Sequence, residues 1–379
     1  MRNYELKSNT LDRFPAIAKS VAAAARKRIR LKFFLGLDTD HAEAALCVII
    51  DGGNPSDFGK HSREVLLALT KELIDKGHRV SAAQEACGFG PYFHRQLHAL
   101  GATSYMLAPE NLSGRRKTDK RDARKLAQLV HDFEVHGNRE SFRPVRDLGE
   151  DKRQRRALSR QRDQLLKVRN QLAGNGRGLM LEFGFLEVPA GWWGRRKWPK
   201  LQAQIELQEG GKWLIRMLDP LRANVLLLHG RIRELEKLLA TSRDAQALRV
   251  VPKGMGNRTM DLIETEVGVW TRFHNRNQTG SFTGLCSGER STGGKRRQGG
   301  IDRQGNARIR KQLVEAVWRL KKWNPGWRAF AKFPHIFGQS ANIGPVAKKK
   351  AVVACARLLM IDLWRLNTGQ TSLENLGMA

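Results

Sequence analysis

Between residues 33 and 149, short apolar segments alternate with amphipathic ones, and this alternation limits the fold more than any other feature of the chain. Strands are predicted at 33–38, 42–51, 79–84 and 103–107, with a short additional strand near Phe58. Helices are predicted at 62–76, at 92–100 and from Asp119 onward. Two early strands, followed by helices and strands in alternation, predict an α/β domain with a mixed sheet.

Four carboxylates lie at the ends of these segments. Asp38 closes the apolar run 33–37, and Glu85 follows the run 79–84. Asp119 and Asp122 are three residues apart, so both point to one side of the first turn of their helix. Acids in a first turn also complement the helix dipole, and capping is the favoured interpretation of that pair alone. Glu85 is harder to explain structurally, because a carboxylate after an apolar strand is costly unless it is paired or bound to a metal.

Taken together, the four acids favour a metal site. Hard divalent cations prefer oxygen ligands, and a pair of Mg²⁺ ions can activate a hydroxyl and stabilise the leaving oxygen of a phosphodiester. The sheet that carries the acids fits a ribonuclease-H-like order of strands. The pattern therefore indicates an enzyme that processes nucleic acid.

The charge of the chain indicates the same partner. Lys and Arg total 68 against 37 Asp and Glu in 379 residues, which gives a formal net charge of +31. Such an excess is self-repulsive unless a polyanion neutralises it, and nucleic acid is the natural candidate. A membrane surface is the competing partner, but no apolar stretch approaches the roughly 20 residues of a transmembrane helix.

The cysteines and the first residues indicate a cytoplasmic protein. Cys47, Cys87, Cys286 and Cys355 form no CxxC pair and are typical of buried thiols in a reducing compartment. Residues 1–32 are predicted to form a basic, partly helical arm, because Lys19 interrupts the only stretch that resembles a signal sequence.

The segment 150–245 is predicted to be a helical linker. Leucines recur every seven residues from Leu158 to Leu179, and a seam with steps of four and three follows from Leu221 to Leu239. This spacing is typical of a coiled coil, although the first stretch fits a plain bundle helix equally well. Asp219 is predicted as the N-cap of the second helix, with Pro220 in its first helical position.

The segment 246–379 carries the third group of signals. A polar loop at 287–306 interleaves glycines with basic residues, which suits contacts to phosphates. The residues predicted to bind nucleic acid are Lys295, Arg296, Arg297, Arg303 and Arg308. The segment 251–256 fits either a phosphate seat at a helix start or a simple turn. The tryptophans at 318, 323 and 327 are predicted to be core residues, and no Walker A motif is present.

These motifs resemble those of the DEDD transposases of the insertion-sequence-110 family. The resemblance rests on Gly36-Leu37-Asp38, Gln84-Glu85-Ala86, the segment 117–127, the segment 282–300 and Gly305-Asn306-Ala307-Arg308. It covers roughly residues 33–360 in order and spacing. It implies a RuvC-like catalytic domain at 33–149, a coiled-coil linker at 150–245 and a mainly α transposase domain at 246–379.

The resemblance also implies the chemistry. Asp38, Glu85, Asp119 and Asp122 would hold Mg²⁺ or Mn²⁺, and a C-terminal serine would form a phosphoserine link with DNA. The serine is Ser291, but an ungapped count from Gly284-Leu285 reaches Thr292. We expect the loop that carries it to fold against the acids, within one chain or across a dimer.

The expected function is a transposase that cuts and rejoins the DNA of its own mobile element. Its expected partners are DNA, a structured guide RNA made by the element, and further copies in a dimer or tetramer, at the nucleoid of a bacterial cell and without a membrane. Two alternatives are a RuvC-type junction nuclease, which needs the four acids but not the serine, and a non-catalytic remnant that only binds nucleic acid.

Overall fold

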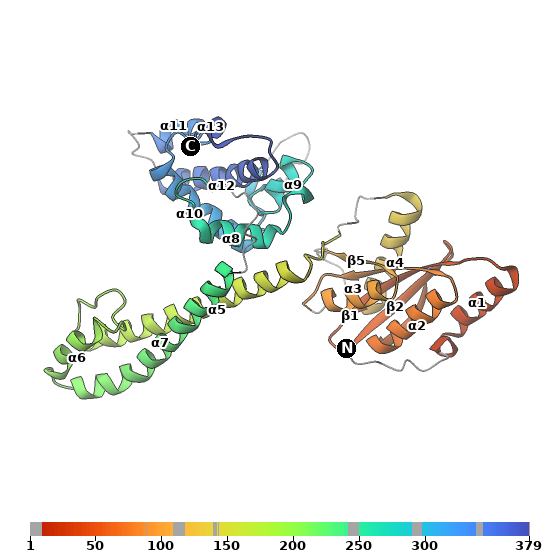
Figure 1. The fold of residues 1–379 in the computed structure, drawn as a ribbon, viewed down its shortest axis with the longest axis horizontal. Coiled ribbons are helices and arrows are strands. Elements are labelled where there is room, and N and C mark those ends of the chain that lie inside the picture. Colours follow the sequence, from red (N-terminus) through yellow and green to blue (C-terminus); the bar gives the residue numbers. More distant parts are fainter. Residues whose placement is uncertain are drawn as a thin grey trace. The chain divides into compact units, whose positions relative to one another are not determined.

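The computed structural model describes residues 10–88, 90–108, 118–138, 142, 144–241, 250–289, 298–338 and 344–378. The chain divides into two compact units, residues 1–147 and 148–379. Figure 1 shows a sheet with flanking helices in the first unit and mainly helices in the second.

The first unit is built around one mixed sheet of five strands in the order β3-β2-β1-β4-β5. Strands β1, β2 and β3 are antiparallel neighbours, whereas β4 runs parallel to β1 and β5 parallel to β4. The elements in chain order are η1 (Thr10–Arg13), α1 (Pro15–Lys27), β1 (Lys32–Thr39), β2 (Glu43–Ile50), β3 (Ser56–Ser62), α2 (Arg63–Asp75), β4 (Arg79–Glu85), α3 (Gly90–Ala99), β5 (Thr103–Leu107) and α4 (Asp119–His136). The predicted strands and helices of this unit are therefore present, including the inferred third strand.

Side chains of successive strand residues point to opposite faces, and the two faces of this sheet have separate cores. Phe33, Leu35 and Leu37 of β1 belong to the cluster that contains apolar residues of α1, α2 and α3. Phe34 and Ala83 belong to the other cluster, together with α4 residues such as Ala127. Helix α4 therefore covers one face of the sheet, and the earlier helices cover the other (Figure 1).

The described part of the predicted basic arm packs on the sheet instead of standing apart from it. Leu11, Phe14 and Ile17 are buried in the core on the α1 side. Their spacing places apolar residues on one stripe of the helix, and the exposed stripe carries the lysines and arginines that suggested an arm.

The second unit begins with a long helical hairpin. Helix α5 (Glu150–Glu182) packs along α7 (Gly211–Thr241), with α6 (Trp198–Glu206) near the turn. Trp192 and Trp198 lie in a small core with residues of α6 and α7. The tryptophan-rich segment thus fills the tip of the hairpin, where Trp192 Nε1 donates to the carbonyl of Ala173 at 2.9 Å.

The predicted start of the second hairpin helix is wrong. Helix α7 begins at Gly211, so Pro220 lies inside it and Asp219 is no N-cap. Proline removes one hydrogen bond from a helix interior, but the preceding turns are held by burial of Leu214 and Leu218 in the core at the hairpin tip. Tertiary packing therefore stabilises a helix that extends on both sides of Pro220, although proline is more common at a helix start.

The rest of the second unit is a mainly helical bundle around one large core. Trp327 is buried there, as predicted, whereas Trp318 and Trp323 are 42% and 48% exposed, against the prediction. The elements in chain order are α8 (Gly256–Val267), η2 (Trp270–Arg272), α9 (Arg276–Ser281), β6 (Ser287–Glu289), β7 (Gln298–Ile301), α10 (Ala307–Trp323), η3 (Phe330–Lys332), α11 (Pro334–Phe337), α12 (Pro345–Asn367) and α13 (Leu373–Leu376). Among the described residues, no helix is long and apolar enough to span a bilayer.

Candidate active site

The four predicted acids lie on the face of the sheet that α4 covers. Leu37 pairs with Gln84 in the parallel register, so Asp38 and Glu85 are the next residues along both strands. Asp38 shares the face of Phe34, and Glu85 shares the face of Ala83, both of which pack against α4. The carboxyl ends of two adjacent parallel strands therefore present acids on one side.

The first turn of α4 supplies the other two acids at the same edge. Gly36 allows this close approach, because a Cβ atom built there would lie 1.9 Å from the Ala123 carbonyl oxygen. Asp119 and Asp122 begin the helix that passes over Gly36, with Asp119 exposed and Asp122 half-buried. A glycine in β1 thus sets the height of the Asp119 and Asp122 carboxylates above the sheet.

A cavity of about 260 Å³ collects three of the four acids. Asp38, Asp119 and Asp122 line it, and Glu85 does not. The other charged residues around it are Asp40, Glu43 and Lys60. The structure therefore brings three predicted residues to one hollow, with Glu85 in the next position across the sheet from Asp38.

Lys60 is the cation of this cavity, and the sequence did not reveal it. Ala45 pairs with both Asp38 and Lys60, so the three stand in one row across β1, β2 and β3. The Lys60 ammonium lies 2.5 Å from the Asp119 carboxylate. The hydrogen bond from Lys60 and its positive charge lower the pKa of Asp119, and the same contact raises the pKa of Lys60. The one available signal was the weakly predicted strand near Phe58, whose register no sequence pattern fixes.

A second ion pair ties β3 to α4 beside the cavity. Arg124 and Lys120 of α4 both contact the Asp57 carboxylate, the Lys120 pair at 3.3 Å. Burial and the nearby Asp57 raise the pKa of the Cys47 thiol to about 12, so this thiol stays protonated under Asp57. These contacts hold the start of α4 against the edge of the sheet.

The donor set of the cavity fits a hard divalent cation. Of the described residues, five carboxylates and one amine line it, and no sulfur or imidazole donor does. Glu85 and Asp122 are half-buried, and no described side chain pairs with either carboxylate. The acids are nevertheless spread apart, since the one group of three ligand atoms within 4.8 Å of one another in the described chain is His131, Asp132 and His136, at the other end of α4.

The predicted nucleophile loop lies largely outside the described residues. Ser291, Lys295, Arg296 and Arg297 fall in the segment that joins β6 to the antiparallel β7. The base of this hairpin is described, and a Cβ atom at Gly305 would lie 2.2 Å from the amide nitrogen of Gly284. Gly284 and Gly305 therefore let the backbone segments before β6 and after β7 touch. Arg303 is exposed and has a positive φ of 60°.

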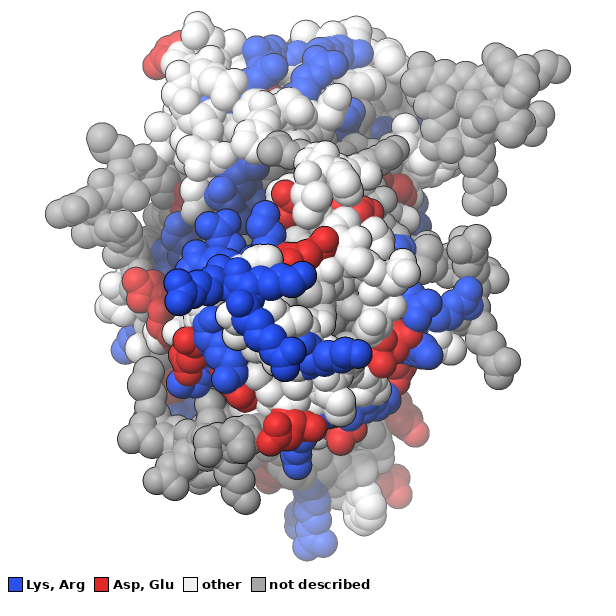
Figure 2. Space-filling model, turned by 90° about the vertical axis from the view of Figure 1, so that its right-hand side faces the viewer, with Lys and Arg blue, Asp and Glu red and all other residues white. Residues whose placement is uncertain are grey.

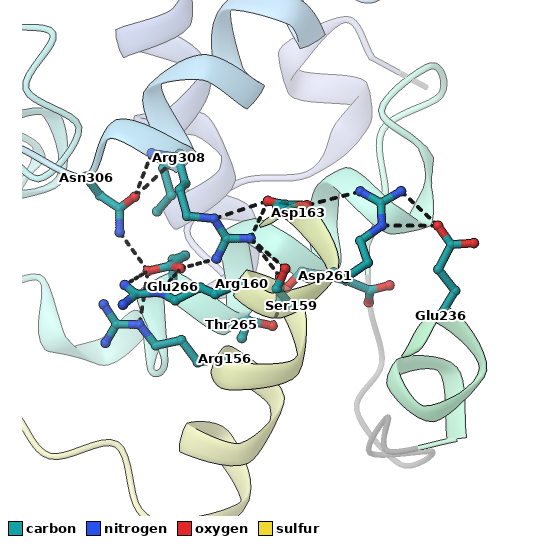
Figure 3. A network of polar contacts seen from close by, with 12 residues as sticks. Arg156, Ser159, Arg160, Asp163, Glu236, Asp261, Thr265, Glu266, Asn306 and Arg308 are labelled. Carbon is teal, nitrogen blue, oxygen red and sulfur yellow. Dashed lines mark hydrogen bonds and ion pairs between the residues drawn. The ribbon is translucent and has the colours of Figure 1, made fainter. Parts of the chain in front are cut away.

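Arg308 was predicted to contact nucleic acid, but its guanidinium is occupied within the chain. It donates to Glu266, to Asp163, and to the carbonyl and hydroxyl of Ser159. Figure 3 shows this residue at the centre of a network between α5, α8 and the start of α10. These contacts leave the guanidinium little capacity to bind a phosphate, and they indicate a structural role.

Glu266 is the buried anion of that network. Its side chain is 0% exposed and contacts Arg156, Arg160 and Arg308. Asn306 donates to it at 2.8 Å while its own oxygen caps α10. Burial alone would raise the pKa of Glu266, but the hydrogen bond from Arg160 and the charge of Arg156 outweigh it and lower the pKa to about 2. The network thus fixes the hairpin helix α5 to the C-terminal bundle.

Comparison with known proteins gives one consistent result. A family model described as "Transposase IS116/IS110/IS902 family" matches residues 246–332. A probable family 20 transposase of Pseudomonas aeruginosa is 28% identical over 244 residues, which cover 62% of this chain and 69% of that protein. The transposase for insertion sequence element IS1111A of Coxiella burnetii is 27% identical over 76% of this chain and 77% of its own length.

These matches identify the class as the transposases of insertion sequences. Within that class, the chain is similar to the IS116/IS110/IS902 family, whose model matches residues 246–332. The transposase for element IS1328 of Yersinia enterocolitica, 28% identical over 62% of this chain and 69% of that protein, agrees with this assignment.

Proposed function

We propose that this transposase cuts and rejoins DNA with the acids of its first unit and a serine of its second. The observation that carries the proposal is the cavity where Asp38, Asp119 and Asp122 meet beside Glu85. The strand order, with three antiparallel strands followed by two parallel ones, supports a ribonuclease-H-like domain of the RuvC type. The packing of α5 on α7 supports the predicted coiled-coil arm.

In this proposal Asp38, Glu85, Asp119 and Asp122 hold divalent cations. Bound Mg²⁺ or Mn²⁺ would lower the pKa of an attacking hydroxyl and neutralise charge on the phosphate. Lys60, which pairs with Asp119, partly offsets the negative charge of the acids and lowers the pKa of Asp119. The half-buried positions of Asp122 and Glu85 limit the water around their oxygens and so strengthen their electrostatic action.

In the proposed reaction, Ser291 is the nucleophile. The Ser291 oxygen would form a bond to phosphorus while the bond to one strand oxygen breaks, and the released strand leaves with the proton as a hydroxyl. The new phosphoserine ester keeps the energy of the phosphodiester, so the strands are rejoined without ATP. This scheme agrees with the absence of a Walker A motif from the sequence.

DNA as the partner is supported by charge. The face at the α1 end of Figure 1 is turned toward the viewer in Figure 2, and Lys and Arg side chains gather there. The exposed basic residues in and just after α1 are Lys19, Arg26, Lys27, Arg28 and Arg30. A guide RNA belongs to the same proposal, because it would add a polyanion to a chain of charge +31. A homo-oligomer belongs to it because the hairpin of α5 and α7 offers an arm through which copies would associate.

Trapping of the covalent adduct tests the proposal. Protein is incubated with labelled DNA of the element ends, transcribed flanking RNA and Mg²⁺, and the products are separated on a denaturing gel. Ser291→Ala is expected to abolish the adduct and leave DNA binding nearly intact. Asp119→Asn is expected to reduce it at least about 100-fold, the range for loss of a group that acts on the reacting atoms. Asp75→Asn, which removes an exposed acid paired with Lys71, is the matched control.

The variants also separate the alternatives. If Ser291→Ala keeps the adduct and Thr292→Val loses it, Thr292 is the nucleophile. Cleavage without any adduct in the wild-type protein would instead favour the junction nuclease. Binding without cleavage would favour a non-catalytic remnant.

A further inference from the structure

We propose that a basic pocket between α9 and α12 binds backbone phosphates of nucleic acid. The pocket lies in the second unit and has a volume of about 400 Å³. In the part of the chain that the structure describes, five cationic side chains line it and only one carboxylate does, that of Asp362. The cations are Arg276 of α9, Arg328 and Lys332 near η3, and Arg357 and Arg365 of α12. The proposal rests on the proposed function, because it names a contact surface for the same DNA or guide RNA.

The single carboxylate cannot neutralise this pocket, because it is already fully used. Asp362 is 3% exposed and accepts from Trp327 Nε1 at 3.0 Å. Its other oxygen accepts from Arg328 at 2.6 Å and lies 3.9 Å from Arg365. Asp362 therefore orients two of the arginines and still leaves the pocket with a large positive excess.

The remaining three cations have no carboxylate partner among the described residues. No ion pair is formed by Arg276, Lys332 or Arg357 in that part of the chain. The Nε atom of Arg357 is buried and has no hydrogen-bond acceptor among the described residues. The chain itself covers this Nε atom beside Gly280, so Arg357 offers the pocket its positive charge, which no described carboxylate neutralises.

The fold holds this arginine in place by close packing. A Cβ atom at Gly280 of α9 would lie 2.7 Å from Arg357 Nε, so the guanidinium packs directly on the backbone of α9 at this glycine. Helices α9 and α12 contact each other along this side of the bundle. The guanidinium therefore lies between the two helices, at the wall of the pocket.

The chemistry of the lining favours phosphodiesters over other anions. Four of the five cations are arginines, whose planar forks match two phosphate oxygens at once. The site is a hollow, and a hollow accommodates a projecting phosphate group better than it accommodates a flat lipid surface. The contact carries no base recognition, so it would position either duplex DNA or structured RNA.

Equilibrium binding of the full chain tests the pocket. Fluorescence anisotropy is measured with a 30-base-pair DNA duplex and an RNA duplex of the same sequence over a series of salt concentrations. Arg276→Gln combined with Lys332→Gln removes two exposed cations of the pocket. The logarithm of affinity is expected to depend less steeply on the logarithm of salt, by roughly one to two units of slope for one or both duplexes.

The matched control removes the same charge elsewhere. Arg195 and Arg196 lie in an exposed turn at the hairpin tip. The double variant Arg195→Gln, Arg196→Gln is expected to keep the wild-type dependence of affinity on salt. Equal loss in both double variants, or an unchanged slope in the pocket variant, would overturn the assignment while DNA binding by the wild type still stands. A wild-type protein that binds neither duplex would overturn the proposed function itself.

A measurement on the wild-type chain does not depend on the folding of any variant. Acetylation of Lys332 is followed by mass spectrometry with and without saturating duplex, with the exposed Lys212 as the reference. Slower acetylation of Lys332 alone supports a phosphate in the pocket. Equal acetylation of Lys332 in both states contradicts it.

Discussion

Lys60 and Asp119 form the ion pair that most directly affects the predicted metal site. Because the hydrogen bond and charge of Lys60 lower the pKa of Asp119, Lys60→Gln should raise that pKa toward its usual value. Both side chains are about half exposed, so solvent screens the pair and the change should be small. Carboxyl ¹³C chemical shifts measured against pH report it directly. Lys71→Gln, which breaks the exposed pair with Asp75, is the control. An unchanged titration of Asp119 would contradict the pairing.

The buried carboxylate of Glu266 gives a second prediction about a single residue, with a larger expected effect. Its pKa falls from an ordinary 4.5 to about 2 in the folded chain, so its stabilisation is complete above about pH 4.5. This stabilisation is lost as the pH falls from about 4.5 through about 2. The ionised Glu266 contributes roughly 3 kcal/mol to the free energy of unfolding when the stabilisation is complete. Glu266→Gln should lose this part of the stability at pH 7, because three arginines would surround a neutral amide.

Chemical denaturation at several pH values measures this effect. The wild-type protein should lose stability on acidification more steeply than the Glu266→Gln variant does. Glu234→Gln, which removes an exposed acid beside Arg231, should behave like the wild type. Parallel curves for all three proteins would show that the buried network does not contribute as argued.

At the scale of elements, two glycines of α5 should respond in opposite ways to the same substitution. A Cβ atom at Gly176 would lie 2.3 Å from the Trp192 ring, whereas Gly178 faces open space. Gly178→Ala should stabilise the helix by about 0.5–1 kcal/mol, because alanine loses less entropy on folding. Gly176→Ala should displace Trp192 and loosen the hairpin tip. Thermal unfolding and tryptophan fluorescence distinguish the two variants, and equal effects would contradict the packing of Trp192 on α5.

At the scale of the whole molecule, the two units should fold independently. Each has its own buried clusters, two around the sheet of residues 1–147 and two in residues 148–379. A fragment of residues 148–379 should therefore unfold in one cooperative transition with a near-native circular dichroism spectrum. In heteronuclear NMR its resonances should overlay those of the full chain except near residue 148. A fragment without cooperative unfolding would show that the second unit depends on the first.

The sequence by itself determined the local elements of the first unit and the residues of its acidic edge. Short apolar runs located β1, β4 and β5 closely, because strands covered on both faces of the sheet leave a nearly continuous apolar pattern in the chain. It also singled out Asp38, Glu85, Asp119 and Asp122, since acids after apolar strands are unusual. The resemblance to a transposase family supplied the class, which the comparisons with known proteins then confirmed.

Only the tertiary structure decided what depends on contacts between distant residues. Lys60 pairs with Asp119 because the register of three strands places it beside the start of α4. Arg308 contacts Glu266 and Asp163, which are more than forty positions away in the sequence. Pro220 lies inside α7 because burial of the preceding turns outweighs the local preference of proline. A residue pattern reports local geometry and burial, whereas pairing of charges and the choice between two helix starts are settled by packing across the whole unit.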